Sequence, residues 1–396
     1  MESIKEIFRI GYGPSSSHTM GPRKAAEIFK SKNPEANSYS ATLYGSLAAT
    51  GRGHQTDKAL IDAFKPFEVI INWEPDVFLP LHPNGLKLEA ILNKKVISSW
   101  TVYSIGGGKI TDFTTDEDEN KIYELTTMKE ILQWTKKTGH SFWEYVEQTE
   151  GKEIYDYLAE VWKVMQDAIA RGVDTDGILP GGLGLSRKAS SYFVKAKNYK
   201  GSLRSKTLIF SYALGVAEEN AAGGKISTAP TCGSCGVVPA VLKYLQESFD
   251  FSEQKILRAL ATAGLIGNIV KENASISGAK VGCQGEIGTA CSMATAAATQ
   301  LLGGTPNQIE YAAEMGIEHH LGLTCDPING LVQIPCIERN AFASERALNT
   351  ATFSLLSDGR HLVSFDKIVA TMNQTGHDLP SIYKETSEGG LALLEL

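Results

Sequence analysis

The sequence predicts an α+β N-terminal domain, a small sheet with helices on one face, followed by a mainly α-helical domain. Short β-like runs separated by turn residues occupy roughly the first 110 residues. Strand signals nearly disappear further on, where Ile154, Leu158, Val161, Met165 and Ala168 recur at steps of four and three, as on one face of an amphipathic helix. The length of 396 residues suits two domains.

Four short β-like runs separated by turn residues predict the strands of the first domain. They are Tyr39–Tyr44, Phe67–Asn72, Lys87–Leu92 and Trp100–Ser104. Helices are expected around Arg23–Lys30 and Thr56–Ala63. A sheet of this size buries one face under such helices.

An acidic run over residues 112–119 predicts a solvated loop in preference to a metal site. We place the domain boundary after it, so that residues 1–145 form the first domain and residues 146–396 the second. In the second domain, Ile256–Val270 and Thr289–Leu302 are apolar on most sides and rich in Ala and Gly, which predicts central helices. Pro180–Gly184 and Ala222–Gly224 predict loops between helices.

Charge and composition narrow the function to small-molecule chemistry. With 38 Lys and Arg against 45 Asp and Glu, the net charge is −7, and the absence of a long basic run argues against nucleic-acid binding. The charged first residues lack the apolar core of a secretory signal, so we expect a cytoplasmic protein. The long uncharged stretch 287–309 contains polar residues and paired glycines, which argues against a membrane span.

All six cysteines lie in the last 165 residues, and a reducing compartment disfavours disulfides between them. Buried thiols, a redox pair and metal ligands remain as interpretations. Cys232 and Cys235 form a Cys-x-x-Cys at a helix start, where a lowered thiol pKa would suit redox exchange or metal binding. Close packing of small residues explains Cys232 equally well, and Cys291 lies in an apolar helix and is expected to be a core thiol.

Three cysteines are predicted to lie in loops. Cys283 has glycines on both sides of its segment, and Cys325 and Cys336 stand next to prolines in two turns, eleven positions apart. Four thiolates close an iron–sulfur cluster, whereas three leave one iron open to a substrate. The pattern is therefore suited to Lewis-acid chemistry, with zinc or no metal as the alternatives.

A loop of glycines, prolines and hydroxyls, Gly11–Pro22, runs into the first predicted helix. Hydroxyls and N–H groups at a helix N-terminus bind anions, and the lack of a P-loop lysine favours a carboxylate over a nucleotide. A serine cap beside a solvent-facing His18 is the simpler alternative. Two more polar turns present His54 and Asn84, and ordinary structural hydrogen bonding would also explain these residues.

Several of these stretches resemble the iron–sulfur-dependent L-serine dehydratases, in the single-chain form with a β-type domain ahead of an α-type domain. The matching segments, in chain order, are Gly13–Pro22, Tyr44–Ser46, Gly51–His54, Tyr103–Gly108, Thr228–Thr231, Asn273–Ala279, Val281–Glu286, Leu323–Pro327 and Pro335–Asn340. The resemblance therefore extends from the first to the last quarter of the chain.

The resemblance implies a [4Fe–4S] cluster held by Cys283, Cys325 and Cys336, with L-serine bound at the fourth iron and converted to pyruvate and ammonia without pyridoxal phosphate. His319 and His18 are the candidate bases, preferred over Glu286 because an unperturbed imidazole titrates nearest neutral pH. The candidate binders of the substrate carboxylate and ammonium are Ser15, Ser16, Ser17, Thr231, Asn273 and Ser275.

The first domain resembles the family's regulatory domain, which implies that His54 and Asn84 contact serine as an effector. Members of the family commonly carry a cysteine near the C-terminus, and residues 387–396 contain none. We therefore expect water, a small anion or Cys232 at the fourth iron. A homodimer is expected, and the rival functions are a related lyase acting on threonine or cysteine, and an amino-acid or redox sensor.

Overall fold

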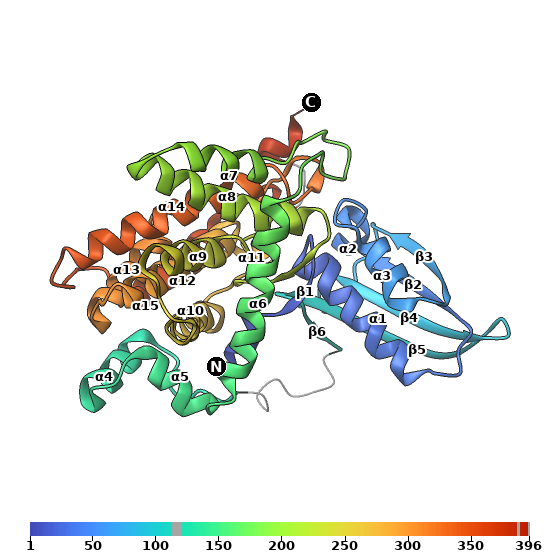
Figure 1. Cartoon of the computed structure of the whole chain (residues 1–396). Coiled ribbons are helices and arrows are strands. Elements are labelled where there is room, and N and C mark those ends of the chain that lie inside the picture. Colours follow the sequence, from blue (N-terminus) through green and yellow to red (C-terminus); the bar gives the residue numbers. More distant parts are fainter. Residues whose placement is uncertain (113–120, 386–388, 395–396) are drawn as a thin grey trace.

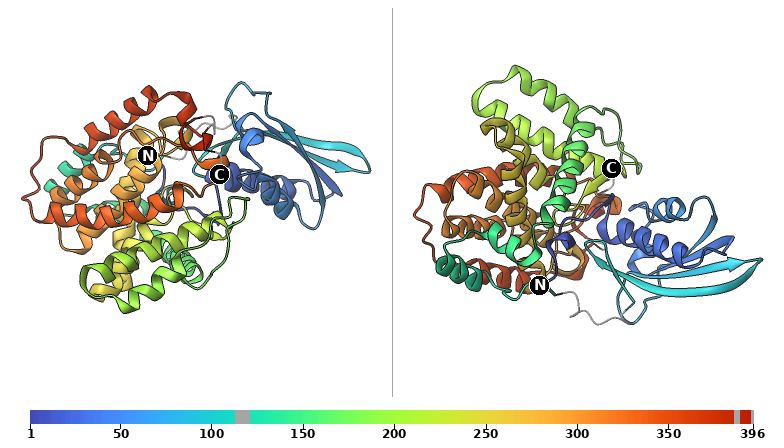
Figure 2. Two further views of the ribbon diagram at one scale, coloured as in Figure 1. Left: turned by 90° about the horizontal axis from the view of Figure 1, so that it is seen from above. Right: turned by 60° about the horizontal axis from the view of Figure 1, so that its bottom comes forward.

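The computed structural model describes residues 1–112, 121–385 and 389–394. It confirms the predicted fold class, because a small sheet with its helices stands beside a larger helical body (Figure 1). We call the sheet with its helices the first part and the remainder the helical body. The two remain side by side in the other two views (Figure 2).

The strands are β1 (Ile10–Tyr12), β2 (Ser38–Tyr44), β3 (Glu68–Glu74), β4 (Gly85–Leu92), β5 (Lys95–Gly106), β6 (Lys109–Thr111) and β7 (Lys225–Ser227). The helices are α1 (Gly21–Lys32), α2 (Ser46–Thr50), α3 (Thr56–Phe64), α4 (Met128–Thr138), α5 (Phe142–Glu150), α6 (Ile154–Val173), α7 (Ala189–Asn198), α8 (Gly201–Ala221), α9 (Val237–Phe249), α10 (Glu253–Asn273), α11 (Gly278–Val281), α12 (Thr289–Leu301), α13 (Pro306–Glu318), α14 (Cys336–Leu355) and α15 (Phe365–Asp378). All four strands and the helices predicted by periodicity are present within a few residues of their expected bounds.

The larger sheet has the strand order β3-β2-β4-β5-β6, in which only β2 and β3 pair in parallel. Helices α1 and α3 pack together over one face and bury Phe29, Leu43 and Leu60 beneath them. On the other face Ile70 is 57% exposed. The prediction of helices on one face of the sheet is confirmed.

Helix α12 is the centre of the helical body, where it packs against α9, α10, α13 and α14. Its residues from Thr289 to Thr299 are all buried. Small side chains allow neighbouring helices to approach it closely from several sides, as its composition predicted.

The N-terminal segment belongs to the helical body by its packing. Met1, Ile4, Ile7 and Phe8 are buried in the same hydrophobic cluster as α10 and α12. Strand β1 then pairs antiparallel with β7, with Gly11 opposite Ile226. The chain therefore crosses the helical body before it enters the sheet, and the division after residue 145 stays a prediction.

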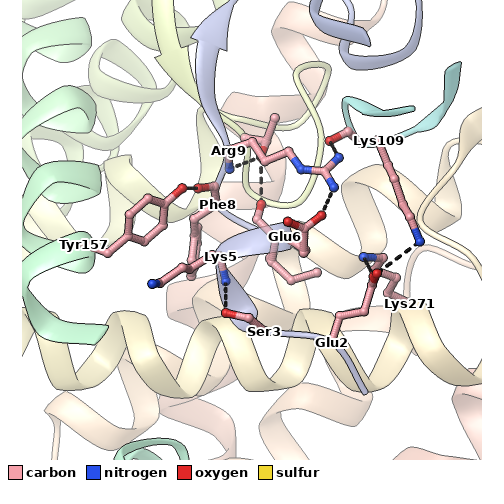
Figure 3. A network of polar contacts seen from close by, with 12 residues as sticks. Glu2, Ser3, Lys5, Glu6, Phe8, Arg9, Lys109, Tyr157 and Lys271 are labelled. Atoms are coloured by element: carbon pink, nitrogen blue, oxygen red, sulfur yellow. Dashed lines mark hydrogen bonds and ion pairs between the residues drawn. The ribbon is translucent and has the colours of Figure 1, made fainter. Parts of the chain in front are cut away.

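A polar network fastens this segment to both parts (Figure 3). The Glu2 carboxylate binds Lys271 of α10 at 2.5 Å and Lys109 of β6 at 3.0 Å. Burial alone would raise the pKa of Glu2, but the two ammonium groups outweigh it and lower the pKa to about 2. Arg9 donates to the carbonyl of Gly107 and pairs with Glu6, so that the glycine turn after β5 is held against the first residues.

Two further expectations concern the acidic run after residue 112 and the absence of a membrane span. The acidic run from residue 113 onward lies outside the described residues, and at its start the Asp112 carboxylate accepts a hydrogen bond from Trp100 Nε1 at 3.0 Å. Among the residues described, no helix has the length and apolar character needed to cross a membrane.

Gly172 is required where α6 crosses α8. A Cβ at this position would lie 2.3 Å from the carbonyl oxygen of Gly215. Alanine is favoured over glycine in a helix by about 1 kcal/mol, but the clash forces the helices apart at a cost of about 1–3 kcal/mol. We expect Gly172→Ala to lower the urea midpoint of unfolding, while Lys163→Ala on the exposed face of α6 leaves it nearly unchanged. An equal or higher midpoint for Gly172→Ala would contradict this packing.

His320 makes the stability depend on acidity. Burial lowers its pKa to about 4, while its Nδ1 hydrogen-bonds the carbonyl of Gly316 at 2.7 Å. The unfolded chain takes up this proton near pH 6.5, so the contribution of neutral His320 to stability is lost as the pH falls from about 6.5 to about 4. When the pH is lowered from 7 to 5, we expect the melting temperature of His320→Gln to fall by less than that of the wild type. The exposed His377→Gln is the control, and the same acid slope in both variants would rule the assignment out.

Candidate active site

A cavity lies where the first part meets the helical body. The empty space between its walls, counted together with the part that is open to solvent, is about 470 Å³. The residues that line it are Pro14, Ser15, Ser16, Ser17, His54, Gly233, Glu286, Cys325, Pro327, Gly330, Val332, Cys336 and Glu385. Hydroxyls and an imidazole from the first part therefore face thiols and carboxyl groups of the second.

The three cysteines predicted to act together lie in or beside this cavity. Cys283 caps the π-helical turn η4 (Gln284–Gly288), which continues into α12, and Cys336 is the first residue of α14. Helix N-termini carry partial positive charge, which favours thiolates and other anions. Cys325 is placed by backbone pairing, because its N–H donates to the carbonyl of Tyr383 at 2.8 Å.

Contacts between the thiols make Cys283 the most acidic of them. A hydrogen bond from Cys325, together with the nearby Arg339 guanidinium, lowers the pKa of Cys283 to about 6. The same contact raises the pKa of Cys325, and burial raises that of Cys336. Arg339 is itself held by donation to the carbonyl of Thr324 at 2.8 Å.

Two carboxyl groups share the cavity with the thiols. Burial, followed by the charge of Glu385, raises the pKa of Glu286 far above its usual range. Burial and the charge of Cys283 raise the pKa of Glu385 to about 7. Gly233 leaves room for one of them, because a Cβ there would lie 2.8 Å from Glu286 Oε2. Several acidic groups are thus crowded into a buried space, which favours a cationic occupant.

The donor set fits an iron–sulfur cluster better than a single ion. Within the described part of the chain, no three His, Cys, Asp or Glu side chains are placed to hold one metal ion. The thiolates of a cluster bind separate irons, so they need not converge on one point. Three cysteines, two of them at helix N-termini, beside a cavity without Lys or Arg among its described lining residues, provide that arrangement.

The hydroxyl loop reaches the cavity because the helical body holds it there. Asn220, near the end of α8, donates from Nδ2 to the carbonyl of Pro14 at 2.9 Å, and the Gly13 N–H donates to Gly224 at 3.2 Å. Ser15 caps the π-helical turn η2 (Ser16–Met20) by accepting from the N–H of His18 at 3.1 Å. Three consecutive serines therefore begin a helix at the cavity wall.

The structure distinguishes the two histidines of the first part. His18 is buried, and its ring nitrogens contact Ser17 Oγ at 2.8 Å and Ser46 Oγ at 3.2 Å. His54 lines the cavity, 4.5 Å from the His18 ring centroid, and its buried Nδ1 has no hydrogen-bond partner among the described residues. Burial lowers the pKa of both, that of His54 to about 4, so both are uncharged near neutral pH.

Three of the candidate residues lie away from the cavity. His319 ends α13, is exposed, and accepts from Arg346 through its carbonyl. Asn273 is exposed and donates to the carbonyls of Ile269 and Thr126. Ser275 lies along a separate interdomain hollow, where its Oγ accepts from the N–H of Ser277.

Two further candidates support neighbours of the cavity or of the sheet. The Thr231 hydroxyl contacts Ser234 Oγ at 3.1 Å and acts to lower the pKa of the nearby Glu286 against the effect of burial. Asn84 is buried and donates to the carbonyl of Ser104 at 3.2 Å, which joins β4 to β5. His54 and Asn84 thus have different surroundings, one at the cavity and one in the sheet.

The remaining cysteines have other environments. Cys291 packs in the helical core, as expected. The expectation of a lowered pKa for Cys232 and Cys235 is wrong, because burial raises the pKa of both thiols. Cys232 contacts Met20 Sδ at 3.7 Å and does not line the cavity.

Sequence reasoning missed three residues that build the site. Asn220 positions the hydroxyl loop, Arg339 contacts Cys283, and Glu385 brings a carboxylate from the C-terminal segment. Arg339 lies within a matching segment and was a detectable candidate. The other two are single polar residues without a local motif, so their roles depend on contacts distant in sequence.

Two protein-family models match this chain, one in its N-terminal segment and one over most of the remainder. The family model described as serine dehydratase beta chain matches residues 3–69, and that described as serine dehydratase alpha chain matches residues 109–392. The chain is 41% identical to L-serine dehydratase 1 of Escherichia coli (strain K12), with 99% of each chain covered. It is 40% identical to L-serine dehydratase of Streptomyces coelicolor, over 99% of this chain and 98% of that one. The Helicobacter pylori (strain J99) L-serine dehydratase is 38% identical, with 98% of each chain covered.

Proposed function

The chain belongs to the serine dehydratase family and is a lyase, and we propose that it converts L-serine to pyruvate and ammonia with a [4Fe–4S] cluster held by Cys283, Cys325 and Cys336. One observation carries the proposal. A single cavity is lined by cysteine thiols of the helical body and by the serines and His54 of the first part. All six cysteines are free thiols, which suits a reducing compartment such as the cytoplasm.

When bound, a cluster with one iron free of cysteine supplies a Lewis acid for the hydroxyl and carboxylate of L-serine. The protein stabilises negative charge at the thiols through the N-termini of η4 and α14 and through Arg339. Ser15, Ser16 and Ser17, at the start of η2, offer hydroxyl and N–H donors to the substrate carboxylate.

We propose His54 as the base that removes the Cα proton, in place of His319 and His18. It lines the cavity and is uncharged, whereas His319 is exposed and both ring nitrogens of His18 are engaged by serines. A substrate carboxylate beside His54 raises its pKa from the low value set by burial, toward the range in which a general base works well. Loss of the Cα proton and of the β-hydroxyl gives aminoacrylate and water, and hydrolysis of its imine tautomer gives pyruvate and ammonia.

The thiol assignment is tested by anaerobic reconstitution with iron and sulfide. Cys283→Ser, Cys325→Ser and Cys336→Ser are each expected to lose the visible cluster absorbance, bound iron and pyruvate release, because a hydroxyl replaces a required thiolate. Cys291→Ser should keep the cluster, since this thiol packs in the core. A full complement of iron in Cys325→Ser would refute the ligand set. Parallel assays with L-threonine and L-cysteine measure the substrate preference.

The base assignment is tested with His54→Asn. We expect kcat to fall by about 10²- to 10⁴-fold, because a positioned base contributes about that much, while the cluster absorbance and iron content stay at wild-type levels. His319→Asn is the matched control and should keep wild-type kcat, because the side chain is exposed. Wild-type turnover in His54→Asn, or a comparable loss in His319→Asn, would transfer the role to another group.

A further inference from the structure

Glu385 is a carboxylate of the cavity to which the reaction above gives no role. Its backbone N–H donates to the carbonyl of Cys325 at 2.7 Å, next to the bond from the Cys325 N–H to Tyr383. Its φ of 58° lies in the left-handed region, which is uncommon for a residue with a side chain. Beyond the undescribed residues 386–388, the N–H of Leu391 donates to the Asp326 carboxylate at 2.8 Å. The C-terminal segment is therefore held against the Cys325 turn at two points.

This placement puts the Glu385 side chain beside the reacting centre. Its Oε1 lies 3.8 Å from Cys325 Sγ. A Cβ at Gly278 would approach the same oxygen to 2.6 Å and Cys325 Sγ to 3.0 Å, so the glycine leaves space for both groups. The described residues that line the cavity include two carboxyl groups, Glu286 and Glu385.

The two carboxyl groups differ in the polar groups that surround them. Glu286 has two polar neighbours, the Thr231 hydroxyl and the N–H of Gly278, which act to lower its pKa against the effect of burial. Among the described residues, Glu385 has only the long thiol contact of Cys325. Glu385 is thus the carboxylate with acceptor capacity left for a ligand.

L-Serine brings a cationic ammonium group into this space, and a buried cation is costly unless it is paired. We propose that the Glu385 carboxylate accepts a hydrogen bond from the ammonium group of the substrate. This contact would select amino acids over hydroxy acids of the same size that lack the amine. The assignment rests on the proposed function, because it presumes that the hydroxyl and carboxylate of L-serine are bound at the cluster. It makes Glu385 a specificity-determining residue.

The test compares ligands with and without the amine. Full-length wild type and Glu385→Gln are reconstituted anaerobically, and binding is measured by titrating L-serine or 3-hydroxypropionate and following the change in the visible absorption spectrum of the cluster. A charge-assisted hydrogen bond is worth about 1.5–3 kcal/mol, so we expect L-serine to bind about 10- to 100-fold more weakly in Glu385→Gln. The affinity for 3-hydroxypropionate should be unchanged or higher, with unchanged iron content. Glu253→Gln, at an exposed position, is the matched control and should bind both ligands as the wild type does.

Each other outcome overturns the assignment. Unchanged L-serine binding shows that Glu385 does not receive the ammonium, and equal weakening of both ligands shows a general effect on the site. Loss of iron shows that Glu385 supports the cluster itself. The wild type separates the two proposals, since a reconstituted wild type without pyruvate release refutes the proposed function, whatever Glu385 does.

Discussion

The convergence of helix N-termini on a buried group of thiols is the constraint on which the rest of the structure depends. Cys283 precedes η4, which continues into α12, and Cys336 begins α14, while η2 and α1 approach from the first part. Each N-terminus brings partial positive charge and free N–H donors. The cavity also contains the carboxyl groups of Glu286 and Glu385, and compensation is needed there because negative charge removed from water is otherwise expensive.

The position of the first part follows from this centre. The hydroxyl loop can face the thiols only if the chain leaves the helical body at the right place, and the pairing of β1 with β7 sets that place. Asn220 then fixes the loop, and the network of Glu2, Lys109 and Lys271 locks the sheet to α10 (Figure 3). A site assembled from two parts is sensitive to how they dock, so these distant contacts are as much a part of the site as the groups that line it.

Much of the fold was predictable because its signals are local. The β-like runs of β2 to β5 with their flanking turn residues, the helical periodicity of α6 and the Ala-rich composition of α12 are all features of short stretches of sequence. The short strands β1, β6 and β7 have only three residues each and were missed. Strands β1 and β7 pair with each other across more than two hundred residues, where local pattern carries little information, and β6 is a short return from the end of β5.

By itself the sequence determined the fold class and singled out Cys283, Cys325, Cys336 and the hydroxyl loop, because chemically distinctive residues with flanking Gly and Pro mark such places locally. The structure places Cys336 at the first residue of α14 and not in the expected turn. Only the tertiary structure decided which single polar residues join them. His54 lines the cavity and His319 does not, although nothing in the local sequence around either histidine separates the two. Glu385 reaches Cys325 across sixty positions of chain. The physical reason is that burial and direction toward a shared cavity come from packing between distant elements, which residue type and spacing do not encode.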